Sequence, residues 1–455
     1  MTRPSARDVA FDTVRAVHAD DAYANLLLPT LLGRAGLSSA DSALATELAY
    51  GTLRRQGTYD AVIAAAADRP VDRIDPAVLD ALRVGVHQLL STRIASHAAV
   101  NETVELVRRV AGRPASGFAN AVLRRVSRDT PGDWAARIEA AARSDDERLS
   151  LRMAHPVWVI RALRRALAAE GRADELDALL TADNAAPRVM MAALPGLADP
   201  PADHTPARYS PFGFLAGSGD PGPLVQSSGG RLRVQDEGSQ LAALALTRAR
   251  PATSGERWLD LCAGPGGKTA ILAAEARAHG AVLEANEPVP ARARLVRQAV
   301  AGVPGEIPVS EADGRERAAS HPGVYDRILV DAPCTGLGAL RRRPESRWRK
   351  TPADVPALTA LQGELLSAAI TALAPGGIVA YVTCSPHLAE TAGVVADVLR
   401  TRDGDVEQLD ARAVLRQVSR APIDLATPID GTGRAQLWPH RHGTDAMSIT
   451  LLQRH

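Results

Sequence analysis

Two of the three cysteines in this chain follow segments that have the character of β-strands. Cys334 lies in the sequence DAPCTG after the apolar run 326–331, and Cys384 lies in TCSP after the run 377–383. A lone cysteine is usually a small buried hydrophobic residue. Two at neighbouring strand ends instead predict thiol chemistry, because thiolates are strong nucleophiles and ligands bind at the carboxyl ends of parallel strands. The pattern does not say which thiol attacks.

A glycine-rich turn precedes both cysteines. After the strand-like run 257–261 the chain reads CAGPGGKT over 262–269, and a helix is predicted to follow. Glycines let the backbone approach a ligand closely, and a helix N-terminus supplies hydrogen-bond donors. A phosphate-binding loop of the type Gly-x4-Gly-Lys-Thr would need a glycine where this chain has Cys262. The turn therefore predicts a ligand site and disfavours a nucleotide hydrolase.

Two acidic residues follow later strand-like runs. Glu287 comes soon after the run 281–286, where a carboxylate can accept hydrogen bonds from both hydroxyls of a ribose. Asp313, in the sequence ADGR, lies where an adenine amino group would be bound, although an Asp-Gly turn would give the same sequence. Together with the glycine turn, these residues predict a nucleoside-type ligand.

The elements that position these residues alternate between short strands and helices from about residue 253 onward. The strand-like runs 257–261, 281–286, 326–331 and 377–383 are separated by helical segments such as 356–374. This rhythm predicts a mostly parallel α/β sheet of the Rossmann type. All the motifs above fall at the carboxyl ends of its strands.

The first part of the chain has a different pattern. Residues 6 to about 128 are predicted to be helical throughout, and in 100–110 the apolar residues recur at i, i+4, i+7 and i+10. A turn at 130–133 and further helices at 140–180 follow, and 187–235 is rich in Pro, Gly and Ser. The predicted fold class is multidomain: an all-α bundle, a small α+β subdomain and the α/β domain.

The composition limits the function classes. With 46% hydrophobic residues, no apolar run near the ~18 residues that span a bilayer and no apolar segment after the N-terminus, we expect a cytoplasmic protein. Three cysteines without a CxxC pair, and histidines without an HExxH pattern, predict neither a disulfide framework nor a metal site. Aromatic residues make up 3% of the chain, so arginine contacts to phosphate would have to carry any RNA affinity.

Positive charge is almost entirely arginine, and lysine occurs only at Lys268 and Lys350. A lysine inside the glycine turn indicates that a compact ammonium group is needed there. The segment 341–350 carries six positive charges in ten residues. Such a run is usually a solvated surface, but its place after Cys334 favours a loop that contacts phosphate.

The motifs at 262–269, 331–336 and 383–385 together resemble those of the Sun/Fmu family of RNA (cytosine-5) methyltransferases. The resemblance continues in the segments 155–158, 234–240 and 341–349, while 47–54 and 116–124 resemble the NusB-type RNA-binding domain. It covers nearly the whole chain, is weakest over 187–225, and is most specific in the pair of cysteine motifs. It implies domains at 1–130 (NusB-like), 140–235 (α+β subdomain) and 236–455 (methyltransferase).

The family implies a role for each motif. Cys384 would add to carbon 6 of cytosine, Cys334 would help to release the methylated product, and Asp331 would also steady the base. The residues implied to bind S-adenosylmethionine are Cys262, Ala263, Gly264, Pro265, Gly266, Gly267, Lys268, Glu287, Asp313 and Asp331. The implied partner is RNA, 16S ribosomal RNA above all, and we expect a monomer.

Two other functions stay open. In DNA cytosine-5 methyltransferases the nucleophilic cysteine follows a proline, which would make Cys334 the attacker, but such enzymes have no Thr-Cys-Ser motif. A non-catalytic RNA-binding protein on the same fold is disfavoured by the intact cysteines and glycine turn. The chain departs from the family after Cys384, where Glu390 alone holds a place in the usual Glu-Asn-Glu stretch; we assign it no catalytic role.

Overall fold

The structure is a computed structural model that describes residues 3–217, 219–402 and 404–455. The chain divides into two compact units. The helical unit comprises Met1–Arg161 and Leu340–Arg349, and the sheet unit comprises Ala162–Ala339 and Lys350–His455. Each unit is described by itself.

The helical unit is built from helices in all its described elements, as the sequence predicted. They are α1 (Ala6–Ala19), α2 (Ala24–Ala35), α3 (Ser39–Arg54), α4 (Gln56–Ala67), η1 (Val71–Arg73), α5 (Pro76–Ser91), α6 (Ser96–Val126), α7 (Pro131–Ala140), α8 (Asp145–Met153), the start of α9 (Val157–Ala168) and α16 (Ser346–Arg349). Helix α5 is the central one, since every residue from Val78 to Gln88 is buried. Local sequence signals set the helix ends: Ser5 and Thr130 form capping boxes that begin α1 and α7.

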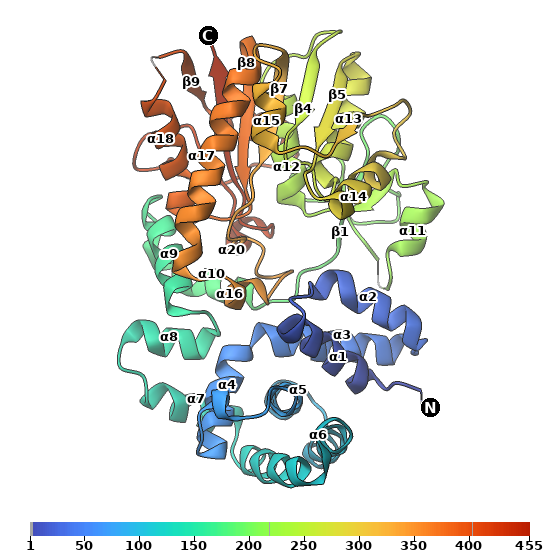
Figure 1. Ribbon diagram of the computed structural model, residues 1–455, viewed down its shortest axis with the longest axis vertical. Coiled ribbons are helices and arrows are strands. Elements are labelled where there is room, and N and C mark those ends of the chain that lie inside the picture. The colour runs from blue at the N-terminus through green and yellow to red at the C-terminus, as the bar shows by residue number, and fades with distance from the viewer. Residues whose placement is uncertain (1–2, 218, 403) are drawn as a thin grey trace. The chain divides into compact units, whose positions relative to one another are not determined.

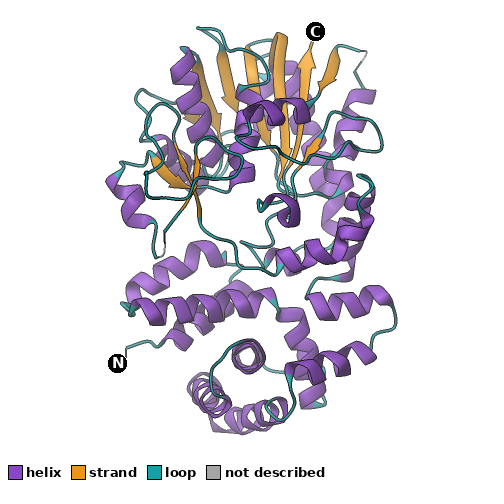
Figure 2. Cartoon of the chain, turned by 180° about the vertical axis from the view of Figure 1, so that it is seen from behind, coloured by secondary structure: helices purple, strands orange, loops and turns teal. Residues whose placement is uncertain are grey.

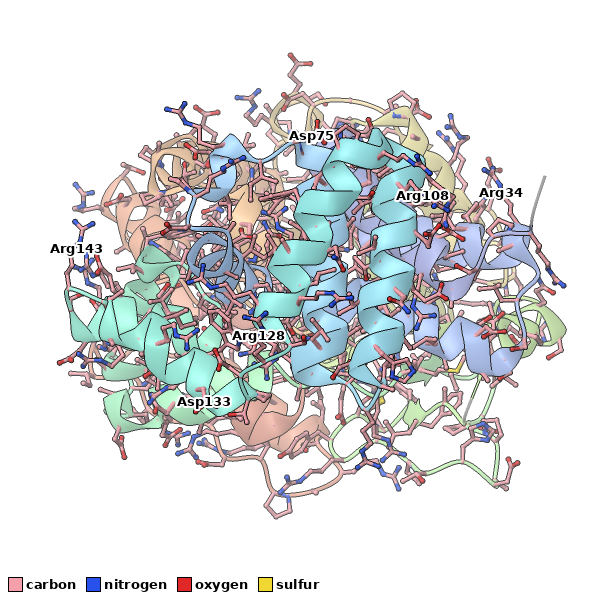
Figure 3. All side chains as sticks on the ribbon, turned by 90° about the horizontal axis from the view of Figure 1, so that it is seen from below. Arg34, Asp75, Arg108, Arg128, Asp133 and Arg143 are labelled. Atoms are coloured by element: carbon pink, nitrogen blue, oxygen red, sulfur yellow. The ribbon has the colours of Figure 1, made fainter. Side chains whose placement is uncertain are left out.

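The segment 340–349 leaves the sheet unit and is packed inside the helical unit. Arg347 is fully buried there, and its Nη1 donates hydrogen bonds to the carbonyl oxygens of Arg54 (3.1 Å) and Ala154 (3.0 Å). Arg341 is also buried. The expectation of a phosphate-contacting loop is therefore wrong for these two arginines, because their side chains are buried inside the helical unit. Exposed charges of this unit lie elsewhere on its surface and include Arg34, Arg108, Arg128 and Arg143 (Figure 3).

The sheet unit begins with the rest of α9, then η2 (Ala173–Glu175) and α10 (Leu176–Asp183), followed by a small antiparallel sheet. This sheet has the order β2 (Gly213–Leu215), β1 (Met190–Ala193), β3 (Leu232–Val234), with the short helix α11 (Gly222–Ser227) beside it. It corresponds to the mixed segment predicted over 187–235.

The main sheet has the order β10-β11-β8-β7-β4-β5-β6, with β9 paired to β11. Its strands are β4 (Arg257–Asp260), β5 (Val282–Asn286), β6 (Val309–Ser310), β7 (Tyr325–Asp331), β8 (Leu373–Thr383), β9 (Val406–Leu409), β10 (Ala435–Gln436) and β11 (Ser448–Arg454). The five strands from β8 to β6 are parallel, and β11 runs antiparallel to β8. The predicted Rossmann-type sheet is confirmed.

Helices cover both faces of the main sheet (Figures 1 and 2). Alternate residues of a strand face opposite sides: on β7, Ile328 and Val330 pack with one group of helices, and Leu329 packs with the other. The first group is α15 (Gly314–Ala319), α17 (Val355–Ala372) and α18 (Ala392–Arg400); the second is α12 (Glu237–Thr247), α13 (Gly267–His279) and α19 (Ala411–Val418). The remaining helices are α14 (Pro290–Val300), α20 (Pro439–His442), η3 (Pro352–Asp354) and η4 (Leu388–Glu390).

The helical stretch Pro352–Ala372 is long and apolar enough to cross a membrane by length and composition. In the structure its apolar residues, such as Leu366 and Ile370, are buried against the main sheet. Its hydrophobicity is thus explained as that of a helix covering a sheet.

The burial of Arg347 yields a prediction about stability. Arg347→Ala should lower the free energy of unfolding of the helical unit by about 2–4 kcal/mol, because each buried polar group left unsatisfied costs about 1–3 kcal/mol. The effect is measured by hydrogen–deuterium exchange of α3 and α8. The carbonyl groups that Arg347 binds lie at the ends of these two helices. Arg108→Ala is the control: this arginine is half exposed, and its loss should change stability by less than about 0.5 kcal/mol. Equal protection in both variants would contradict the prediction.

Candidate active site

The parallel pairing of β7 with β8 brings two cysteines together. Asp331, the last residue of β7, is paired with Val382 of β8, so the two strands end at the same level of the sheet. Cys334 and Cys384 follow, and their Sγ atoms are 3.5 Å apart. Both are free and partly exposed thiols. This is the arrangement that the two strand-end motifs predicted.

The surroundings make the two thiols unequal. The hydrogen bond to Cys384, followed by burial, raises the pKa of the Cys334 thiol well above its ordinary value. The two sulfurs share one hydrogen-bonding contact, in which either thiol can be the donor. The third thiol, Cys262, is also held neutral, because burial raises its pKa.

A buried ion pair stands beside this thiol pair. Nζ of Lys268, in the first turn of α13, lies 2.7 Å from Oδ2 of Asp331. Burial alone would lower the pKa of Lys268, but the charge of Asp331 and its hydrogen bond raise it, and negative charge on Cys384 adds to this effect. The ammonium group is thus held charged within electrostatic reach of Cys384.

The glycine turn wraps around the carboxylate of Glu287. The Gly264 amide donates to Oε2 of Glu287 at 3.1 Å, and a Cβ atom on Gly264 would lie only 2.2 Å from that oxygen. Gly266 has φ 102°, which favours glycine, and begins α13 without a side-chain cap. The first amides of α13 are therefore not satisfied by a capping side chain, as expected of a site that receives a polar ligand.

Two buried polar atoms next to this turn also lack a protein partner among the described residues. They are Oδ1 of Asp260, at the end of β4, and Oε1 of Gln235, whose side chain lies 3.6 Å from the place of a Cβ on Gly267. Unsatisfied buried oxygens are rare and point to an unseen partner. The turn thus fits a small ligand that carries hydrogen-bond donors.

Asp313 follows β6 and caps α15 through the amide of Arg315 at 2.8 Å. Its hydrogen bonds with the Arg315 side chain lower the pKa of Asp313 to about 2. The carboxylate therefore has a structural role in the turn, and a role in adenine binding stays a prediction.

The structure brings all the predicted site residues to one edge of the main sheet. Cys384 follows β8, Asp331 and Cys334 lie at the end of β7, and the glycine turn follows β4, with Glu287 after β5 and Asp313 after β6. Their individual roles remain predictions.

Sequence reasoning missed a buried polar cluster behind the two cysteines. Glu390, in η4, contacts Thr335 and Ser385, which directly follow Cys334 and Cys384, and also Gln362 of α17. The available signal was a hydroxyl residue after each cysteine together with an acidic residue six positions past Cys384.

Comparison with known families gives two matches. A family model described as 16S rRNA methyltransferase RsmB/F matches residues 249–453, and the NusB family model matches residues 4–128.

Similar proteins align over nearly the whole chain. "Putative methyltransferase Rv1407" of Mycobacterium tuberculosis is 49% identical over 458 residues, covering 99% of this chain and 96% of that protein. "Ribosomal RNA small subunit methyltransferase B" of Pseudomonas putida is 34% identical, covering 90% and 93%. The crystal structure of PH0851 is similar in fold, with a TM-score of 0.81 over 100% of both chains at 20% identity.

The contact between the two cysteine loops predicts the effect of a small substitution. The amide of Gly338 donates to the carbonyl oxygen of Cys384 at 2.8 Å, and a Cβ atom on Gly338 would lie 2.0 Å from the carbonyl oxygen of Ala446. Gly338→Ala should therefore destabilise the sheet unit by about 1–3 kcal/mol, as overpacking does, and should change the alkylation rate of Cys384. Urea unfolding and iodoacetamide labelling measure both effects. Gly363→Ala in α17 is the control, because its Cβ would meet its nearest neighbour at 3.9 Å.

The burial of Asp260 predicts a dependence of stability on pH. Burial raises the pKa of Asp260 to about 7 from an ordinary 3.8, so between these values the folded state holds a proton that the unfolded state has lost. Stability should therefore fall as the pH rises from about 4 to about 7, by up to about 1.4 kcal/mol per pH unit. Asp260→Asn cannot ionise and should lack this slope when urea unfolding is compared at pH 4.5, 6 and 7.5. Parallel curves for both proteins would show that Asp260 ionises normally.

Proposed function

Because the chain belongs to the 16S rRNA methyltransferase RsmB/F family, we propose that it methylates carbon 5 of a cytosine in 16S ribosomal RNA. S-adenosylmethionine is the proposed methyl donor, and the reaction runs through a covalent bond between Cys384 and the base. The observation that carries the proposal is the pair of thiols 3.5 Å apart beside the Lys268–Asp331 ion pair.

Carbon 5 of cytosine is a poor nucleophile, and the first step makes it more reactive. The thiolate of Cys384 attacks carbon 6 and forms an S–C6 bond. The electron pair of the C5–C6 double bond shifts to the C4–C5 bond, and that of the C4–N3 double bond moves to N3. Carbon 5 gains electron density as a result. An ordinary free thiol is only a few per cent thiolate at neutral pH. The ammonium of Lys268 and the hydrogen bond from Cys334 both favour the thiolate form of Cys384.

In the next steps carbon 5 takes the methyl group and the enzyme is released. S-adenosylmethionine supplies an electrophilic methyl group. Methyl transfer leaves S-adenosylhomocysteine. The proton on carbon 5 then passes to solvent water, its electron pair restores the C5–C6 double bond, and Sγ of Cys384 leaves carbon 6 as a thiolate. We assign Cys334 to assist this release, because its sulfur lies next to the bond that breaks. Asp331 steadies the base.

The residues proposed to bind S-adenosylmethionine are those of the glycine turn, Cys262 to Lys268, together with Glu287, Asp313 and Asp331. The unsatisfied oxygens of Asp260 and Gln235 support a ligand at this place. Residues 1–130 are proposed to bind RNA, with phosphate contacts from exposed arginines, and residues 140–235 to contribute to the RNA surface. We propose that the protein works in the cytoplasm as a monomer.

A DNA-type mechanism, with Cys334 as nucleophile, is the alternative. It is disfavoured by the Thr383-Cys384-Ser385 motif, which DNA cytosine-5 methyltransferases lack. A DNA substrate also does not account for the NusB-family domain, which we propose binds RNA.

The roles of the two cysteines are tested with labelled S-adenosylmethionine and 16S ribosomal RNA from a strain that lacks the modification. Cys384→Ala should abolish methyl transfer. Cys334→Ala should accumulate a covalent protein–RNA adduct that survives denaturing electrophoresis, because addition proceeds and release does not. The double variant is the control and should form no adduct. An adduct in Cys384→Ala, absent in Cys334→Ala, would reverse the roles and favour the DNA-type mechanism.

A further inference from the structure

Glu390 is a carboxylate buried behind both cysteine loops. Its side chain is fully buried at the end of η4. Oε2 accepts a hydrogen bond from Ser385 Oγ at 2.7 Å and another from Thr335 Oγ1, and Oε1 accepts from the Thr335 amide at 2.7 Å. Nε2 of Gln362 donates to Oε1 at 3.2 Å. One side chain therefore receives four hydrogen bonds.

These hydrogen bonds join the two loops next to their thiols. Thr335 directly follows Cys334, Ser385 directly follows Cys384, and their hydroxyl oxygens lie 3.0 Å apart. Gln362 also donates to the carbonyl oxygen of Pro333 at 2.8 Å. Glu390 and its partners thus hold the backbone on both sides of Cys334 and the residue after Cys384.

Glu390 also brings negative charge to one side of the thiol pair. It has no ion pair with a described residue, so hydrogen bonds alone compensate the charge. The pKa of Cys334 is raised first by its hydrogen bond to Cys384 and then by burial, and the charge of Glu390 raises it further. Lys268 interacts electrostatically with Cys384.

The other ionisable groups around the thiol pair do not favour a negative charge on one thiol over the other. They are Asp260, Cys262, Asp331, Tyr381 and His387. Burial raises the pKa of Cys262 and of Tyr381 and lowers that of His387, so these three groups are neutral near pH 7. Asp331 is paired with Lys268.

We propose that Glu390 is a positioning residue that assigns the roles of the two cysteines. It holds both loops at contact distance and keeps the proton on Cys334, so that Cys384 carries the negative charge and attacks. The assignment to an attacking step rests on the proposed function; the effect on the two thiols does not.

The test separates charge from packing with Glu390→Gln. The amide oxygen can accept from the Thr335 amide and from Gln362, and the amide nitrogen can donate to the hydroxyls of Thr335 and Ser385, which rotate to accept. All four hydrogen bonds are kept while the charge is removed. Glu390→Ala removes both. Glu237→Gln is the matched control, because Glu237 is a buried carboxylate that accepts hydrogen bonds from the amides of Tyr209 and Ser210 and contacts neither loop.

The readout is iodoacetamide labelling of the full-length protein between pH 6 and 10, with each cysteine quantified by mass spectrometry. In the wild type, Cys384 should be labelled in preference to Cys334. In Glu390→Gln the ratio of Cys334 to Cys384 labelling should rise about tenfold at pH 8, which corresponds to a change of about one pKa unit. Glu237→Gln should keep the wild-type ratio.

A ratio in Glu390→Gln within twofold of the wild type would overturn the proposal, and Glu390 would then be a structural residue only. Labelling needs neither RNA nor a methyl donor, so this result is independent of the methyl-transfer assay. If the ratio shifts but the wild type methylates no cytosine, the proposed function fails and the effect of Glu390 on the thiols stands. With active enzyme, Glu390→Gln should lower kcat at least tenfold and leave the KM for RNA unchanged.

Discussion

The parallel register between β7 and β8 is the constraint on which the site depends. Because Asp331 and Val382 are paired, the loops that carry Cys334 and Cys384 start level with each other, and their sulfurs come into contact. The strand on the other side of β7 is β4, so the glycine turn lies beside the same two loops. A slip of the register would separate the thiols and turn the wrong side chains toward the helices. The placement of the two thiols therefore depends on this backbone pairing.

Buried charge at this edge of the sheet is compensated in two different ways. A charge removed from water is costly unless it is paired or well hydrogen-bonded. Lys268 and Asp331 neutralise each other and leave the ammonium near Cys384. Glu390 is compensated by hydrogen-bond donors and not by a cation. Its negative charge contributes to the raised pKa of Cys334. The two kinds of compensation therefore occur on either side of β7's cysteine loop: an ion pair at Lys268 and a set of hydrogen bonds at Glu390.

Much of this was predictable from the sequence, including the family and the NusB-family domain, which the comparisons confirm. The strands 257–261 and 326–331 are found with bounds shifted by one residue, because apolar runs that end in glycine or proline turns are strong local signals. The arginine-rich segment was misjudged. Whether Arg347 meets water or the carbonyl of Ala154 is decided by residues 193 positions away. Glu390 was underrated for the same reason, since its partner Thr335 is 55 positions away.

The three cysteines show that the reactivity of a thiol is set by its surroundings and not by residue type alone. All three follow strands of one sheet at one edge. Cys262 has carboxylates around it and is buried, so its proton is held. The pKa of Cys334 is raised by its hydrogen bond to Cys384, by burial and by the charge of Glu390. Cys384 interacts electrostatically with the ammonium group of Lys268. Thiolates are favoured beside positive charge, and the pairing of β4, β7 and β8 brings Lys268 and the two cysteine loops to one edge of the sheet.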